Sequence, residues 1–237
     1  MTRRRWIADE VSGNHAALVG AHAEHLAVVL RARVGQHFDI AAGDVLRSGR
    51  ITSVATNRIE FELGEELPAA TIPNITLVLA VFKFDRMEWA IEKCTELGVA
   101  RFVPVIAHRT DAHLGRATAT RLQRWQRIAR QASEQSRRVA PPALDPPLKL
   151  KDAAVLAAPT RILLAESEHQ LTLKDALQSH SPGEELLLAL GPEGGWTDDE
   201  LSQFAQAGWA SASLGSTILR AETAAIAATA IAIAELS

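Results

Sequence analysis

Glycines and a proline cluster directly after a short apolar run near residue 190. The run Leu186–Leu190 has five apolar residues, and Gly191–Gly195 follows with three glycines and one proline. This pattern is typical of a buried strand that turns into a loop. Glycines let a backbone approach a ligand and present its N–H groups. The loop has no lysine and Glu193 would repel a triphosphate, so we expect a neutral or cationic ligand edge, such as ribose hydroxyls, adenine or a sulfonium.

A second glycine turn follows the expected strand at 210–214. It passes through Gly215 to Arg220 and Glu222, whereas the first turn leads into a capping-box pattern from Thr197 to Glu200. Either turn alone would be explained by an ordinary strand-to-helix connection. Two turns of this kind, the second followed by an arginine and a glutamate, favour a binding site.

Strands and helices alternate from residue 74 onward. We expect strands at 75–82, 101–107, 161–166, 186–190 and 210–214, and helices at 85–97, 117–138, 171–178, 197–207 and 221–236. The alternation predicts an α/β domain with a mostly parallel sheet covered on both faces. Ligands bind beyond the carboxyl ends of such strands. Glu166, Gly191–Gly195 and Gly215–Arg220 lie at strand ends, so we expect them to line one pocket.

The first seventy residues have a different pattern. Short strand candidates separated by turns such as Gly43-Asp44 and Thr56-Asn57 predict a small β-barrel, interrupted by one helix at about 22–31. The acidic and proline-bounded stretch 65–73 marks the predicted domain boundary. We therefore expect a barrel domain over 1–70 and the α/β domain over 74–237.

Charge is distributed unevenly along the chain. The net charge is −3, yet 101–151 holds eleven basic and three acidic residues, whereas 152–237 is acidic. Such segregation favours one basic face that meets a polyanion. The alternative is a solvated, arginine-rich helix.

Composition excludes several other classes. The chain has 237 residues, 47% of them hydrophobic, with no uncharged apolar run long enough to cross a bilayer. A single cysteine, Cys94, excludes an internal disulfide, and the N-terminal sequence does not resemble a secretory signal. The eight histidines show no metal-ligand spacing. We expect a cytoplasmic protein that needs no metal and no membrane.

Several motifs together resemble one known family. They are GPEGG at 191–195, LGSTILRAET at 214–223, DRMEWAIEKCTELGV at 85–99, RWQRIARQASEQSRR at 124–138 and AEHLAVVLRARVG at 23–35. In combination they are similar to the ribosomal RNA small subunit methyltransferase E family, whose members are uridine-N3 methyltransferases of the SPOUT superfamily. Two positions depart from the family pattern: Phe82-Lys83-Phe84 replaces a small glycine-containing turn, and Ala224 stands where many relatives have proline.

The resemblance implies a fold, a cofactor and a substrate. The expected fold is a PUA-like β-barrel that binds RNA, followed by an α/β domain tied in a trefoil knot. The expected cofactor is S-adenosyl-L-methionine, bound in the knot. The expected partners are 16S rRNA, in the 30S subunit, and a second copy of the chain in a homodimer. The competing class is a module of the same fold that holds RNA without chemistry, or an enzyme that methylates another base.

The resemblance and the chemistry together nominate site residues. A uridine N3 carries a proton at neutral pH, so attack requires its removal or stabilisation of the growing carbonyl charge. We expect Arg220 to stabilise that charge, and Glu193 either to face the sulfonium or to accept the proton. The alternatives are an ion pair of Arg220 with Glu222, and a merely helix-capping role for Glu193. The expected cofactor-binding residues are Leu164, Glu166, Leu190, Gly191, Pro192, Gly194, Gly195, Leu214, Gly215, Ile218, Leu219 and Thr223. The expected RNA-binding residues are Arg3, Arg4, Arg5, Arg86, Arg109, Arg137 and Arg138.

Overall fold

The structure is a computed structural model that describes residues 5–69 and 72–237. Internal contacts divide the chain into two compact units. The first unit is Met1–Thr71 with Ser133–Ala140, and the second is Ile72–Ala132 with Pro141–Ser237. The sequence assigns 133–140 to the α/β domain, so the return of this segment to the first unit is a difference from expectation.

The first unit is built on a curled six-stranded sheet. Its strands are β1 (Arg5–Ile7), β2 (Glu10–Ser12), β3 (His15–Val19), β4 (His37–Ala42), β5 (Val45–Ala55) and β6 (Arg58–Glu66). The order is β1-β4-β5-β6-β3-β2, and only the β1–β4 pair is parallel. The two edge strands are consecutive in the chain: Ala8 N donates to Ala41 O, and Asp9 N donates to Ala17 O, both at 2.9 Å. The sheet therefore curls until its edges meet.

A short helical segment covers the core of the first unit. The single helix expected at 22–31 is instead α1 (Ala21–Glu24) running into a π-helical turn, η1 (His25–Val29). Leu26 from this turn is fully buried with Ile40, Ile51 and Phe61.

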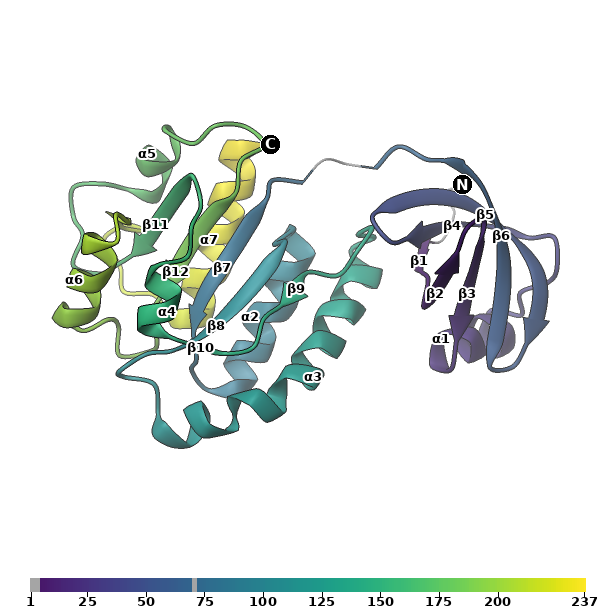
Figure 1. Cartoon of the computed structure of the whole chain (residues 1–237), viewed down its shortest axis with the longest axis horizontal. Coiled ribbons are helices and arrows are strands. Elements are labelled where there is room, and N and C mark those ends of the chain that lie inside the picture. The colour runs from purple at the N-terminus through teal and green to yellow at the C-terminus, as the bar shows by residue number, and fades with distance from the viewer. Residues whose placement is uncertain (1–4, 70–71) are drawn as a thin grey trace. The chain divides into compact units, whose positions relative to one another are not determined.

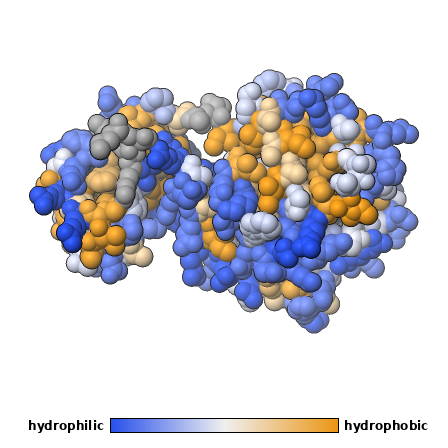
Figure 2. All heavy atoms as spheres, turned by 180° about the vertical axis from the view of Figure 1, so that it is seen from behind, coloured by the Kyte–Doolittle hydropathy of each residue, from blue (hydrophilic) through white to orange (hydrophobic). Residues whose placement is uncertain are grey.

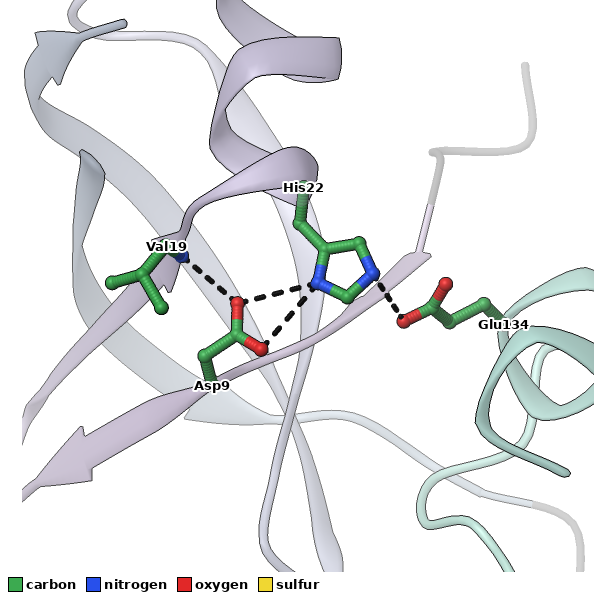
Figure 3. Close-up of polar contacts among 4 residues, drawn as sticks. All are labelled: Asp9, Val19, His22 and Glu134. Carbon is green, nitrogen blue, oxygen red and sulfur yellow. Dashed lines mark hydrogen bonds and ion pairs between the residues drawn. The ribbon is translucent and has the colours of Figure 1, made fainter. Parts of the chain in front are cut away.

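The segment Ser133–Ala140 is attached to the first unit by polar and apolar contacts. His22 lies between two carboxylates: its Nδ1 is 3.3 Å from Asp9 Oδ2, and its Nε2 is 3.2 Å from Glu134 Oε1 (Figure 3). Asp9 also accepts from Val19 N at 2.9 Å. Val139 packs beside Ile7 in a small apolar cluster. These contacts explain why the segment groups with the sheet and not with the α/β unit.

The second unit holds a parallel sheet. Its strands are β7 (Ile75–Ala80), β8 (Arg101–Ile106), β9 (Ala143–Leu144), β10 (Leu148–Lys149), β11 (Thr160–Leu164), β12 (Leu186–Leu190) and β13 (Ala210–Ala212). The order is β10-β8-β7-β12-β11-β13, and β9 also pairs with β8. Every pair is parallel. The central strands β7 and β12 are buried along their whole length, as expected for a sheet with both faces covered.

Helices cover both faces of this sheet, as the alternating sequence pattern predicts (Figure 1). They are α2 (Phe84–Leu97), α3 (Ala112–Gln135), α4 (Leu150–Ala154), α5 (Leu173–Leu177), α6 (Asp198–Gln206) and α7 (Ala221–Leu236). One core joins Leu77 and Leu188 to residues of α2, α5 and α7. The other joins Val78 and Leu187 to residues of α4 and α6. Successive strand residues thus enter opposite cores, as the period of a β-strand requires.

Both phenylalanines of Phe82-Lys83-Phe84, the segment that departs from the family pattern, pack within the second unit. Phe82 is buried, and the Phe84 ring meets Trp125 edge-on with centroids 5.9 Å apart. Phe84 belongs to α2 and Lys83 is the N-cap, so the helix begins one residue before the expected start at 85. Glu88 in the first turns of α2 pairs with Arg124 Nε at 2.6 Å.

Candidate active site

A cavity of about 790 Å³ lies at the carboxyl ends of β11, β12 and β13. Three loops surround it: residues 165–169 after β11, 191–196 after β12 and 213–219 after β13. Small-molecule sites occupy about 300–1,000 Å³. The structure thus brings together the three segments that the sequence placed at strand ends.

The first glycine loop has the tight geometry that its composition suggests. Gly195 N donates to Pro192 O at 2.8 Å, and Gly195 has φ +69°, which disfavours a side chain. A Cβ on Gly191 would stand 3.3 Å from the Trp196 indole, whose Nε1 donates to Leu164 O at 3.2 Å. Glycine at 191 therefore leaves room for the tryptophan that ties this loop to the end of β11.

The predicted capping box at the start of α6 is present. Thr197 accepts from Glu200 N, and the Glu200 carboxylate accepts from Thr197 N at 2.9 Å. Glu200 is only 4% exposed and accepts a further bond from His108 N at 2.7 Å. This carboxylate therefore joins the first glycine loop to the connection between β8 and α3.

Arg109 comes from that connection and forms part of the cavity wall. Its Nη1 donates to Gly194 O and, at 3.3 Å, to Trp196 O. We expected Arg109 to contact RNA phosphates. The structure places its guanidinium against the loop, where the carbonyls of Gly194 and Trp196 accept its hydrogen bonds.

Most of the expected cofactor-binding residues line the cavity. Those that do are Leu164, Glu166, Leu190, Gly191, Pro192, Gly194, Gly195, Leu214, Gly215, Ile218 and Leu219, together with Glu193. Thr223 is exposed and does not line it, because α7 has already begun at Ala221 and turns this side chain away. Residues that the sequence argument missed include Ser167, His169, Trp196, Asp198, Ser213 and Ala224. Position directly after a strand was the signal available for Ser167 and Ser213.

The charged residues of the cavity wall are mostly acidic. Glu166, Glu193 and Asp198 face one arginine, Arg109. This balance disfavours a polyphosphate and suits a ligand that carries positive charge, in agreement with the expectation from the glycine loop. Ile218 stands 81% exposed at the second loop, so the site also offers an uncovered apolar side chain.

Arg220 is the N-cap residue of α7, and its side chain is exposed. Among the described residues it makes no hydrogen bond or ion pair, and it is not part of the cavity wall. Its expected alternative partner, Glu222, is 2% exposed and is taken by Arg86 Nη1 at 2.9 Å. Glu222 thus pairs with Arg86 instead of Arg220, and within the described residues the Arg220 guanidinium, directly after the second loop, has no ion-pair partner.

Comparison with known proteins identifies the family. The RNA methyltransferase domain matches residues 70–233. The ribosomal RNA small subunit methyltransferase E of Rickettsia conorii is 31% identical over 214 residues, which cover 87% of this chain and 84% of that protein. The same enzyme of Synechocystis is 34% identical over 216 residues, covering 87% of this chain and 69% of that protein. The chain belongs to the ribosomal RNA small subunit methyltransferase E family.

The fold is also similar to solved structures of methyltransferases. A ribosomal RNA small subunit methyltransferase E from Neisseria gonorrhoeae, bound to S-adenosyl methionine, superposes with a TM-score of 0.82 at 31% identity and covers 96% of this chain and 95% of its own. The putative methyltransferase Lpg2936 from Legionella pneumophila, in complex with the same cofactor, has a TM-score of 0.83 at 26% identity over 99% and 98% of the two chains.

The arginines expected to bind RNA in this member of the methyltransferase E family have varied surroundings. Arg3 and Arg4 lie outside the described residues. Arg5 Nη1 donates to the carbonyl of Arg137, a residue with φ +59° and an exposed side chain. Burial lowers the pKa of the Arg138 guanidinium to about 10, and its Nε donates to Ala140 O at 3.3 Å. Arg86, Arg109 and Arg138 thus already have acceptors within the protein, and their contact with RNA phosphates stays a prediction.

Other reactive groups of this methyltransferase lie outside the cavity. Cys94 is fully buried, and desolvation raises the pKa of its thiol to about 12, which suits a packed core residue and not a nucleophile. Within 5–69 and 72–237, no group of three or more His, Cys, Asp or Glu side chains gathers as a metal would require. In the same ranges no helix has the length and apolar character to cross a bilayer.

Proposed function

We propose that this protein transfers a methyl group from S-adenosyl-L-methionine to N3 of a uridine in the 16S rRNA of the small ribosomal subunit, in the cytoplasm. The observation that carries the proposal is the cavity at the ends of β11, β12 and β13, with its two glycine turns and its acidic wall. Membership of the methyltransferase E family supports the reaction class, and two structural neighbours bind this cofactor.

The residues around the cavity fit the chemical groups of the donor. Leu164, Leu190 and Leu214 offer apolar contacts for an adenosine. Glu166 and Asp198 supply negative charge for a sulfonium and an ammonium. S-adenosylmethionine supplies an activated methyl group, so the protein has chiefly to orient the reactants and to polarise the base.

The uridine requires charge stabilisation and loss of a proton. Arg220 is exposed beside the second loop and has no described partner, so its guanidinium is available for the oxygens of an incoming base. Glu193 is exposed on the first loop and is likewise unpaired among the described residues. In the proposed reaction Arg220 stabilises the negative charge on the uracil carbonyls, and Glu193 accepts the N3 proton.

The family also supports proposals about architecture. We propose that the curled sheet of the first unit is a PUA-like barrel that binds RNA, and that the loops after β11, β12 and β13 form a trefoil knot. A homodimer is proposed on the apolar character of α7. Hydrophobic residues gather over the second unit in Figure 2, and Ile226, Ile231 and Ile233 of α7 are only partly buried. Exposed Trp89 of α2 adds to the apolar surface available to a partner.

A methylation assay on intact subunits tests the reaction. The protein would be incubated with methyl-labelled donor and 30S subunits from a strain that lacks this modification, and the labelled nucleoside would be identified by mass spectrometry. We expect 3-methyluridine in 16S rRNA. Label on another base would overturn the uridine assignment. Absence of label together with absence of donor binding would leave a module that only holds RNA.

A further inference from the structure

We propose that Arg109 is a positioning residue that holds the first glycine loop in the shape that admits the methyl donor. The proposal rests on the proposed function, because it takes that donor as the ligand of the loop. It assigns Arg109 to the loop and not to RNA.

One guanidinium nitrogen of Arg109 spans the carbonyls of residues 194 and 196. A peptide plane points its N–H opposite its C=O. Holding Gly194 O therefore directs Gly195 N toward Pro192 O, where it donates at 2.8 Å. Holding Trp196 O directs Thr197 N toward Glu200, where it donates at 2.9 Å. The arginine thus fixes the 194–195 and 196–197 peptides, which lie on either side of the 195–196 peptide, and Gly195 between them has φ +69°.

The stem of Arg109 packs on the loop as well. A Cβ built on Gly194 would lie 3.2 Å from Arg109 Cδ, which is closer than ordinary contact. Gly194 therefore lets the aliphatic stem lie flat against the backbone while the guanidinium reaches the carbonyls.

The backbone that carries Arg109 is fixed on both sides. On one side His108 N donates to the buried Glu200 carboxylate at 2.7 Å. On the other, Thr110 Oγ1 donates to Val81 O at 2.9 Å and accepts from Ala107 N at 3.2 Å. A guanidinium on an anchored backbone can impose its geometry on a glycine-rich loop, which has little stiffness of its own.

Donor binding and loop exchange test the proposal directly. We would titrate S-adenosylmethionine calorimetrically into the wild type, Arg109→Ala and Arg109→Lys, and follow hydrogen–deuterium exchange of residues 191–197 without ligand. Charge-assisted bonds of this kind correspond to about 10- to 100-fold in affinity. Arg109→Ala should weaken donor binding by that factor and speed exchange in the loop, whereas Arg109→Lys should recover part of both. In turnover, KM for the donor should rise while kcat at saturating donor stays within several-fold.

A matched control separates positioning from general stability. Arg161 Nη1 also donates to a backbone carbonyl, that of Leu156 at 3.5 Å, outside the cavity wall. Arg161→Ala should leave donor affinity unchanged, even if it lowers Tm. If Arg109→Ala binds donor and exchanges like the wild type, and only KM for RNA rises, the arginine is a phosphate ligand and the proposal fails. If the wild type binds no donor, the proposed function fails, and loop exchange still decides the role of Arg109.

A double-mutant cycle with Gly194 gives an independent test. Gly194→Ala places a methyl against the arginine stem, so it should weaken donor binding in the wild type and have little further effect in Arg109→Ala. Full additivity of the two effects would show that residue 194 acts on the donor directly and would contradict the coupling proposed here.

Discussion

Two arginines near the start of α7 have opposite surroundings. Arg86 is bound to the buried carboxylate of Glu222, whereas Arg220 is exposed and unpaired among the described residues. Because Arg86 satisfies Glu222, Arg220 is not held by the nearest acidic residue in sequence. The structure thus leaves one cation available beside the second glycine loop.

Replacing Arg220 by alanine should reduce methyl transfer far more than it reduces donor affinity. A preorganised donor to a developing oxyanion contributes about 3–4 kcal/mol, so we expect a loss of roughly two to three orders of magnitude in rate. The dissociation constant for S-adenosylmethionine should stay within several-fold. Single-turnover methylation and calorimetry on the same preparation give both values. A parallel loss of donor binding and activity would instead make Arg220 a cofactor ligand.

Replacing Gly195 by valine should abolish donor binding. Gly195 has φ +69°, and a β-branched residue is strongly disfavoured there. No atom lies closer than 3.9 Å to a built Cβ, so the defect would arise from backbone strain and not from a clash. Calorimetry measures the effect, and Gly183→Val, at φ +84° in a loop outside the cavity wall, is the matched control. Normal donor affinity in Gly195→Val would contradict a role for this loop.

At the scale of elements, one ion pair links the first turns of α2 and α7. Arg86 is 38% exposed, but its partner Glu222 is nearly sealed from solvent at 3%. Removing one partner of a fully buried pair costs about 3–5 kcal/mol. Because solvent screens the partly exposed Arg86, we expect Arg86→Ala to lower the free energy of unfolding by less, about 2 kcal/mol. Urea denaturation measures it. The double variant Arg86→Ala/Glu222→Gln should recover part of the loss, because the amide carries no charge; a fully additive result would contradict the pairing.

The attachment of Ser133–Ala140 to the first unit should depend on pH, because His22 is a titratable group in that contact. The hydrogen bond from His22 to the Glu134 carboxylate, followed by the negative charge of that residue and of Asp9, raises the pKa of His22 against the lowering effect of burial. A folded pKa above the unfolded value of about 6.5 means that the protonated form stabilises the fold. The contribution is complete below about pH 6.5 and is lost as pH rises through the raised value.

We expect the difference in the free energy of unfolding between the wild type and His22→Gln to depend on pH. The wild type should be more stable at pH 6, and this advantage should shrink steadily as pH rises above about 7. Urea unfolding at a series of pH values measures it. In a Glu134→Gln background the pH-dependent part should diminish, because the main cause of the shift is gone. A difference that is constant with pH would mean that His22 acts by packing alone.

Particular elements show what the sequence could and could not predict. The limits of β12 and α7 match expectation at every residue, because a run of apolar residues between glycines, or a long alanine-rich stretch, leaves few alternatives. The contacts of Arg109 with the first glycine loop were not predicted, since its acceptors lie 85 and 87 residues away in the chain. The same holds for Glu222 and Arg86, 136 residues apart. Local patterns predict elements and loops, but pairings between distant side chains depend on how the sheet brings its loops together.

At the scale of the whole molecule, we predict a homodimer in which α7 contributes to the interface. A surface helix with apolar residues on more than one face would be unfavourable in a monomer. Ala230 is exposed on α7, so Ala230→Glu should shift the protein toward monomer in light scattering at micromolar concentration. Ala205→Glu, the same substitution at an exposed site of α6, is the control. A wild-type monomer at that concentration would refute the prediction.

The central pairing of the sheet also bears on how the chain emerges from the ribosome. β7 lies next to β12, and Ile75 pairs with Leu186, more than a hundred residues later. During synthesis β7, which is apolar on both faces, therefore cannot pair with β12 until β12 has left the exit tunnel. Contacts of such long sequence separation slow folding and prolong the exposure of hydrophobic, aggregation-prone strands. A nascent chain that ends before residue 186 should accordingly bind chaperones that recognise hydrophobic segments, and should be released once β12 is complete.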